Sequence, residues 1–119
     1  MEFEELEVWK RAKRLCVDVY IKLKDLKDFG FKDQITRSSL SVPSNIAEGF
    51  ERNSQRECIN FLSYSKGSCA ELRTQIHIGI EIGYIDYAAG NAWLKEAKEI
   101  SNMLVGLIKT KRKFIKNQA

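Results

Sequence analysis

Hydrophobic side chains recur every three or four residues along most of the chain, and charged residues fill the positions between them. This spacing places the apolar residues on one face of an α-helix, so it predicts amphipathic helices rather than strands, in which side chains alternate. Four such segments are expected, at about 4–27, 32–51, 54–82 and 86–116. Because their connections are short, the simplest closed packing is an all-α, up-down-up-down four-helix bundle. We expect residues 1–119 to form this single domain.

The second segment differs from the others because small and polar residues, several serines among them, separate its apolar positions. It also contains the only proline, Pro43, which has no N–H to donate and whose ring crowds the carbonyl of Ser39. We therefore expect a continuous second helix that is kinked at Pro43. Its small side chains would allow a neighbouring backbone to approach closely.

Local signals mark the predicted helix ends. Ser54 and Glu57 have the spacing of a capping box and predict the start of the third helix. Asp86 can cap the fourth helix in the same manner. Gly30 is expected to end the first helix, since glycine readily adopts the left-handed conformation that closes helices.

The apolar stripes of the four segments predict the core. We expect it to contain Trp9, Leu23, Val42, Ile46, Phe61, Leu62, Leu72, Ile76, Ile80, Ile100, Leu104 and Leu107. A second apolar row beside the stripe of the third segment would remain in water in a lone bundle, and it predicts an oligomer interface. This row comprises Tyr64, Ile78, Ile82 and Ile85. A closed ring would bury one such row on every subunit.

Charge is distributed unevenly along the chain. Residues 1–108 hold 15 of the 20 Lys and Arg residues and all 16 Asp and Glu residues, a net charge of −1, whereas 109–119 carry +5. The cations of this basic tail are Lys109, Lys111, Arg112, Lys113 and Lys116. They are candidates for binding nucleic acid, but they would equally complement the dipole of the last helix and favour solubility.

We expect neither a secretory signal nor a membrane-spanning helix. No apolar run approaches the ~18 residues of a spanning helix, and the N-terminus is acidic where a secretory signal would be basic, so we expect a cytoplasmic protein without a membrane partner. The three cysteines, Cys16, Cys58 and Cys69, are expected to be reduced and to fill apolar space.

Residues with catalytic or metal-binding potential are scarce. His77 is the only histidine and lies within a helical segment, without the spacing of a metal site. Residues 66–68 lack the upstream glycine of a phosphate loop. We predict no catalytic residue, no metal and no cofactor, and we interpret Gly67, Gly79 and Gly83 as positions where a neighbouring helix lies close.

Polar side chains accompany the small-residue helix. Asn45, Glu48, Arg52 and Glu71 are interpreted as a structural polar network or interface. The alternative is an enzyme pocket at a subunit interface, built around the first three of these residues.

The central stretch carries a specific motif. It reads P-S-N-I-A-E-G from Pro43 to Gly49, then R-N-S-Q-R-E from Arg52 to Glu57, and closely resembles the four-helix-bundle proteins encoded in 23S ribosomal RNA intervening sequences. The resemblance extends from Leu6 over nearly all of the chain, with Ser65 where such proteins are expected to have alanine. It implies a four-helix bundle, a ring-shaped homopentamer, and kinship with accessory proteins of diversity-generating retroelements, which associate with nucleic acid and a reverse transcriptase. It implies no catalytic residues.

The leading hypothesis is therefore a non-enzymatic, oligomeric binding protein whose basic surface contacts RNA or DNA. The alternative is a protein–protein assembly scaffold with no nucleic-acid role.

Overall fold

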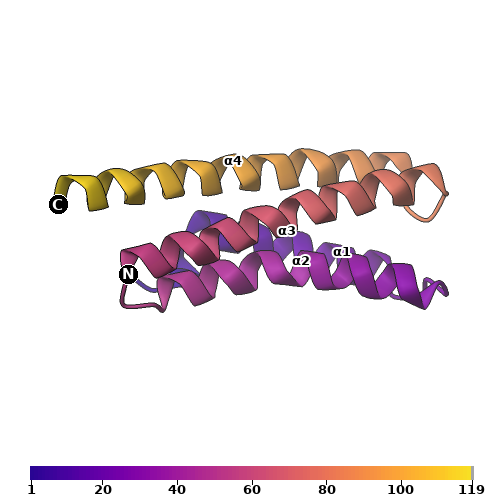
Figure 1. Cartoon of the computed structure of the whole chain (residues 1–119). Helices are drawn as coiled ribbons and strands as arrows, with labels where there is room; N and C mark the ends of the chain where they lie inside the picture. The colour runs from indigo at the N-terminus through magenta and orange to yellow at the C-terminus, as the bar shows by residue number, and fades with distance from the viewer. Residues whose placement is uncertain (119) are drawn as a thin grey trace.

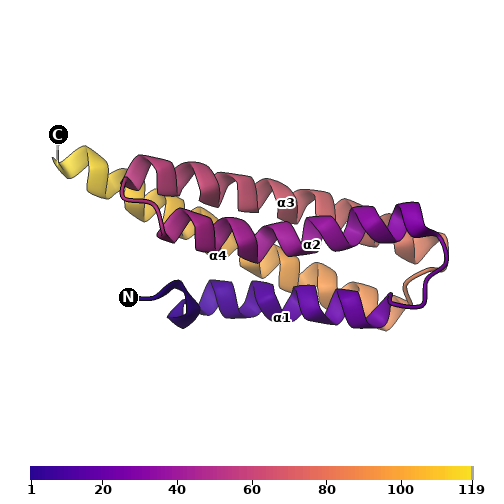
Figure 2. The ribbon, with the colours of Figure 1, turned by 90° about the horizontal axis from the view of Figure 1, so that it is seen from below.

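The computed structural model describes residues 1–118, which form a four-helix bundle without strands (Figure 1). A short 3-10 helix, η1 (Phe3–Glu5), precedes four α-helices. These are α1 (Glu7–Lys22), α2 (Phe29–Phe50), α3 (Gln55–Glu81) and α4 (Tyr87–Gln118). Each helix contacts the next one in sequence, and α1 also contacts α4, which closes the up-down-up-down arrangement (Figure 2). The predicted fold class is confirmed.

Side-chain caps set the starts of α2, α3 and α4. Ser54 Oγ accepts the backbone N–H of Glu57 at 3.3 Å, and Asp86 Oδ1 accepts that of Ala89 at 2.8 Å, as their positions predicted. The prediction for Gly30 is wrong. Asp28 caps α2 by accepting the N–H of Phe31 at 3.1 Å, so Gly30 lies in the first turn of α2.

Helix α2 passes through Pro43 without interruption, and its small residues bring it close to α3. Ser65 Oγ donates to the carbonyl of Val42 at 2.8 Å, and the hydroxyls of Ser41 and Ser68 lie 2.8 Å apart. These hydrogen bonds satisfy buried polar atoms across the α2–α3 contact. The predicted continuous helix is confirmed, and the kink at Pro43 stays a prediction.

One apolar core joins the four helices. Eight of the twelve predicted core residues are buried, and the others lie half-buried at its edge: Trp9, Phe61, Ile80 and Leu107. No helix within residues 1–118 is long and apolar enough to cross a membrane.

The chain turns sharply after α3, and this turn overturns part of the predicted interface. Gly83 has a φ of +80°, a conformation that suits glycine. The turn directs Ile85 back into the core, where it is 3% exposed. A Cβ at Gly79 would overlap the Ile85 side chain and would lie 3.1 Å from Phe31 Cζ of α2, so the close approach of a neighbouring helix predicted at Gly79 is confirmed. A Cβ at Gly67 or at Gly83 would have no heavy atom of another element within 4 Å, so the predictions of a close helix at these two glycines are wrong, and Gly83 instead forms the turn.

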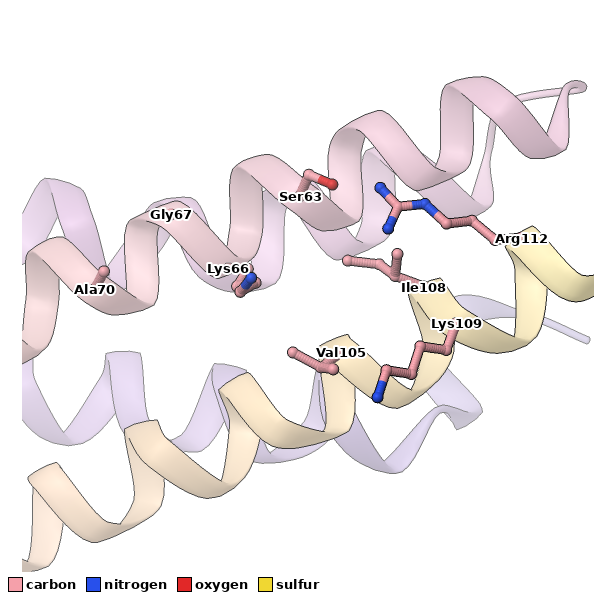
Figure 3. A pocket seen from close by; sticks show the side chains of 8 residues that line it. All are labelled: Ser63, Lys66, Gly67, Ala70, Val105, Ile108, Lys109 and Arg112. Atoms are coloured by element: carbon pink, nitrogen blue, oxygen red, sulfur yellow. The ribbon is translucent and has the colours of Figure 1, made fainter.

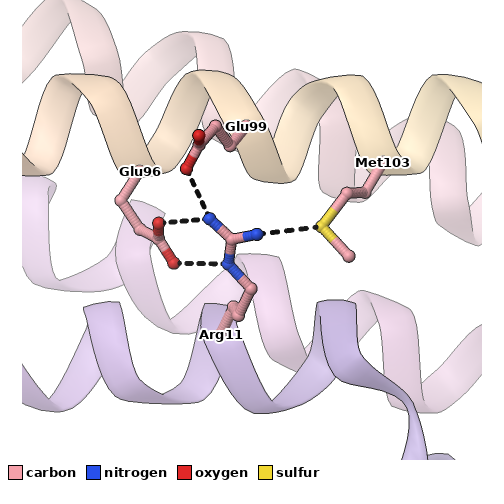
Figure 4. A network of polar contacts seen from close by, with 4 residues as sticks. All are labelled: Arg11, Glu96, Glu99 and Met103. Atoms are coloured by element: carbon pink, nitrogen blue, oxygen red, sulfur yellow. Dashed lines mark hydrogen bonds and ion pairs between the residues drawn. The ribbon is translucent and has the colours of Figure 1, made fainter.

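Polar contacts close the seam between α1 and α4. Arg11 Nε and Nη2 donate to the two carboxylate oxygens of Glu96 at 2.9 and 2.6 Å, and Nη2 also contacts Glu99 (Figure 4). Further along this seam, Trp93 Nε1 donates to Asp18 Oδ2 at 2.6 Å. The bidentate hydrogen bond from Arg11 holds the pKa of Glu96 below its usual value.

Candidate functional site, a basic groove between α3 and α4

The five cations of the basic tail all lie in the last turns of α4. The tip of this helix extends beyond the loop between α2 and α3 (Figure 2). They do not form one cluster. Lys109, Arg112 and Lys116 line hollows that face α3. Lys111 is half-buried elsewhere, where its ammonium donates to Gln55 Oε1 at 2.9 Å and lies 4.7 Å from the centre of the Phe50 ring.

Two adjoining hollows separate the first half of α3 from the end of α4. The first, of about 330 Å³, is lined by Ser63, Lys66, Gly67, Ala70, Val105, Ile108, Lys109 and Arg112 (Figure 3). The second, of about 460 Å³, is lined by Arg56, Ile59, Asn60, Arg112, Ile115 and Lys116. Because Arg112 lines both, we treat the two hollows as one feature, the α3–α4 groove.

The charge of the α3–α4 groove has one sign. Its cations come from both helices, and they are Arg56, Lys66, Lys109, Arg112 and Lys116. No carboxylate of residues 1–118 lines either hollow. In the same residues none of the five cations forms an ion pair, whereas Arg11, Arg37 and Arg52 are each paired with a carboxylate. The groove therefore presents exposed cations to an external anion.

Arg56 and Lys66 are groove residues that the sequence analysis missed. They lie in the stretch 1–108, where acids and bases nearly balance, so the count of charges along the chain does not reveal them. The helical spacing of residues in α3 does, however, indicate these two cations. Arg56, Ser63, Lys66 and Ala70 share one face of α3, which is small and basic beside the apolar stripe.

The predicted polar network is only partly assembled. Arg52 lies 3.6 Å from a carboxylate oxygen of Glu48 and 3.6 Å from one of Glu57. Asn45 is apart from them and donates to the carbonyl and hydroxyl of Ser41 at 2.9 and 2.8 Å. Glu71 is exposed and makes no hydrogen bond or ion pair with residues 1–118.

Two exposed apolar rows lie on different helices. Three residues of the predicted interface on α3 are 46–57% exposed: Tyr64, Ile78 and Ile82. A row on α1 that the sequence analysis missed is 42–62% exposed: Val17, Tyr20 and Ile21. Its signal was the position of Val17 and Ile21, four residues apart and outside the main stripe of the first helix.

The cysteines and the histidine contribute no site. Cys16, Cys58 and Cys69 are buried and free, and burial raises the pKa of each thiol, that of Cys69 to about 12. His77 is exposed on α3. No group of three or more metal-ligating side chains comes together within residues 1–118.

Comparisons with known proteins identify relatives of the chain. Residues 4–106 match the family described as 23S rRNA-intervening sequence protein. The bundle is also similar to the crystal structure of a protein with unknown function from the S23 ribosomal protein family of Bacteroides thetaiotaomicron VPI-5482. That structure has a TM-score of 0.80 and 25% sequence identity, over 86% of this chain and 98% of the other. Among curated proteins there is no match. The match over residues 4–106 shows that this chain belongs to the 23S rRNA-intervening sequence protein family.

Proposed function

We propose that this chain is a non-enzymatic, oligomeric binding protein of the cytoplasm that contacts RNA or DNA through its basic surface. The observation that carries the proposal is the α3–α4 groove, where five exposed cations from two helices face no carboxylate within residues 1–118. Such a surface attracts the phosphate backbone of a nucleic acid and releases its counterions on binding. The proposal assigns no catalytic residue, metal or cofactor.

The assembly we propose is a ring, with five subunits as the family resemblance implies. A ring needs two different surfaces on each subunit, because each contact joins one face to another. The exposed row on α3, formed by Tyr64, Ile78 and Ile82, supplies one, and the row on α1 supplies the other. Repetition around the axis would bring together ~25 cations from the basic tails alone, which makes a modest cluster effective.

Light scattering at micromolar concentration tests the assembly. The expected result is a mass of five chains, and Ile78→Glu is expected to reduce it because the variant places a charge in the buried interface. A monomeric mass for the unaltered protein refutes the ring, and a dimeric or tetrameric mass removes its five-fold symmetry.

Nucleic-acid binding is tested with a variant that carries Gln at Lys109, Lys111, Arg112, Lys113 and Lys116. We expect the unaltered protein to bind RNA or DNA at low salt with an affinity that falls steeply as salt rises, and the variant to bind more weakly. Both proteins must first show the same oligomeric mass. Equal affinity, or no binding by the unaltered protein, contradicts the proposal.

The second candidate is an assembly scaffold that binds another protein, and the exposed apolar rows on α1 and α3 favour it. A reverse transcriptase is the partner that the family resemblance implies. Under this reading the five-Gln variant keeps its protein partner and differs from the unaltered protein only slightly in stability.

A further inference from the structure

We infer that the α3–α4 groove is a track for the sugar–phosphate backbone of a single-stranded nucleic acid, with Arg56 and Lys66 of α3 among its phosphate contacts. The inference rests on the proposed function and deepens it, because it selects the groove over the basic tail as the binding site. It adds Arg56 and Lys66 to the residues that contact phosphate, although the count of charges along the chain does not reveal them. Two cations of the tail, Lys111 and Lys113, lose that role.

The cations form two rows along the groove. On α3, Arg56 and Lys66 are ten residues apart, or ~15 Å along the helix axis. On α4, Lys109 and Lys116 are seven residues apart, or ~10 Å, with Arg112 between them. In Figure 3, Arg112 extends from α4 toward Ser63, and Lys66 projects from α3 on the side of α4. A strand that places one phosphate every ~3.4 Å or more could meet about three or four phosphates over this length.

The floor of the groove is apolar. It includes Ile59, Val105, Ile108 and Ile115, with Ala70 at one end. A single strand exposes sugar and base faces that can contact such a floor, whereas a duplex buries its base faces in the stack. The groove also lies between two packed helices, whose axes are typically ~8–10 Å apart, so a duplex could touch only its rim.

The groove lacks the means to read a sequence. No aromatic side chain of residues 1–118 lines either hollow, so bases have no stacking platform there. Recognition therefore depends on phosphate charge and on non-selective apolar contact. The expected ligand is a single strand of RNA or DNA without strong sequence preference.

The tail cations outside the groove provide a matched control. Lys111 is engaged with Gln55 and Phe50, and Lys113 is exposed but lines neither hollow. The pair Arg56→Gln and Lys66→Gln removes two charges from the groove, and the pair Lys111→Gln and Lys113→Gln removes two from the tail outside it. If only the overall positive charge matters, both pairs of substitutions should weaken nucleic-acid binding equally. If the groove holds the strand, the groove pair should weaken binding more than the tail pair.

Fluorescence anisotropy with a labelled oligouridine of about 20 nucleotides, over a salt series, measures the difference. We expect the groove pair to weaken binding ~10-fold and to reduce the salt slope by about 1.4, since each contact to a single strand contributes about 0.7. The tail pair should weaken binding less than ~3-fold. A duplex of the same length should bind the unaltered protein more weakly than the single strand. Circular dichroism and light scattering confirm that both pairs keep the fold and mass.

The outcomes separate this inference from the proposed function. If the unaltered protein binds but the two pairs lose affinity equally, or the tail pair loses more, the track is overturned and nucleic-acid binding stands. If the duplex binds as tightly as the single strand, the assignment of a single-stranded ligand is overturned. If the unaltered protein binds neither probe at low salt, the proposed function fails and the track fails with it.

Discussion

Gly90 and Gly106 lie inside the same helix, α4, but have opposite surroundings. A Cβ at Gly90 would lie 2.4 Å from Ile80 Cδ1, 2.5 Å from Ile80 Cγ1 and 3.3 Å from Ile85 Cγ2. At Gly106 no heavy atom outside its own helix backbone and sequence neighbours lies within 4 Å of that position. Replacing each glycine with alanine therefore separates the effect of helix propensity from the effect of packing.

The expected magnitudes follow from these contacts. Alanine stabilises a helix interior by up to ~1 kcal/mol relative to glycine, so Gly106→Ala should raise the free energy of unfolding by ~0.5–1 kcal/mol. At Gly90 the added methyl group overpacks the core, which costs ~1–3 kcal/mol. The end of the half-buried Ile80 side chain can shift to make room, but Ile85, which the added methyl group also approaches, is buried. After the propensity gain is subtracted, Gly90→Ala should lower the free energy of unfolding by ~1 kcal/mol.

Urea unfolding followed by the helical circular dichroism signal measures both variants. All samples need the same protein concentration, because association would add stability that depends on it. Gly90 lies in the first turn of α4, where the propensity gain is no larger than at Gly106, so the difference between the variants sets an upper limit on the packing cost. If Gly90→Ala stabilises the protein as much as Gly106→Ala does, α4 does not approach Ile80 and Ile85 as described.

Two further predictions concern the core and the α1–α4 seam. Leu72 is fully buried, so Leu72→Ala should lower the free energy of unfolding by ~2–5 kcal/mol in the same urea assay, and a loss below about half a kcal/mol would contradict its position. Because Arg11 lowers the pKa of Glu96 in the folded state, the ionised carboxylate stabilises the fold above the usual pKa of 4.5, and this stabilisation is lost as the pH falls through the lower, folded-state pKa. The stability difference between the unaltered protein and Glu96→Gln should therefore shrink from about pH 7 to about pH 3, and a constant difference would contradict the role of this ion pair.

Helical periodicity predicted the number and order of the helices because burial of an apolar stripe depends on spacing that the sequence displays directly. It failed where one residue changes the chain direction. The apolar row of α3 continues to Ile85 only if the helix does, but Gly83 ends it with a positive φ and sends Ile85 into the core. Gly30 shows the same difficulty at a helix start, since the cap two residues earlier, Asp28, decides its place.

The sequence alone predicted only part of the candidate site. Counting charges along the chain finds the basic tail, because five cations stand there without an acid. It cannot find Arg56 and Lys66, which become neighbours of the tail only through the antiparallel packing of α3 against α4. Which tail cations face the groove depends on the rotation of α4 about its axis, and that is fixed by core residues such as Leu104 and Ile108.

The unequal helix lengths shape one end of the groove. α4 has 32 residues and α1 has 16, and the end of α4 extends past the loop between α2 and α3, where Ile115 and Lys116 line the second hollow (Figure 2). The first hollow lies alongside the four-helix core, where residues 63–70 of α3 face Val105 and Ile108. The five groove cations are exposed, so their charges cost little desolvation. Five cations there still repel one another, since no carboxylate of residues 1–118 offsets them. A bound polyanion would relieve that repulsion, so the feature that costs the free protein stability is the same one that would give a phosphate backbone its affinity.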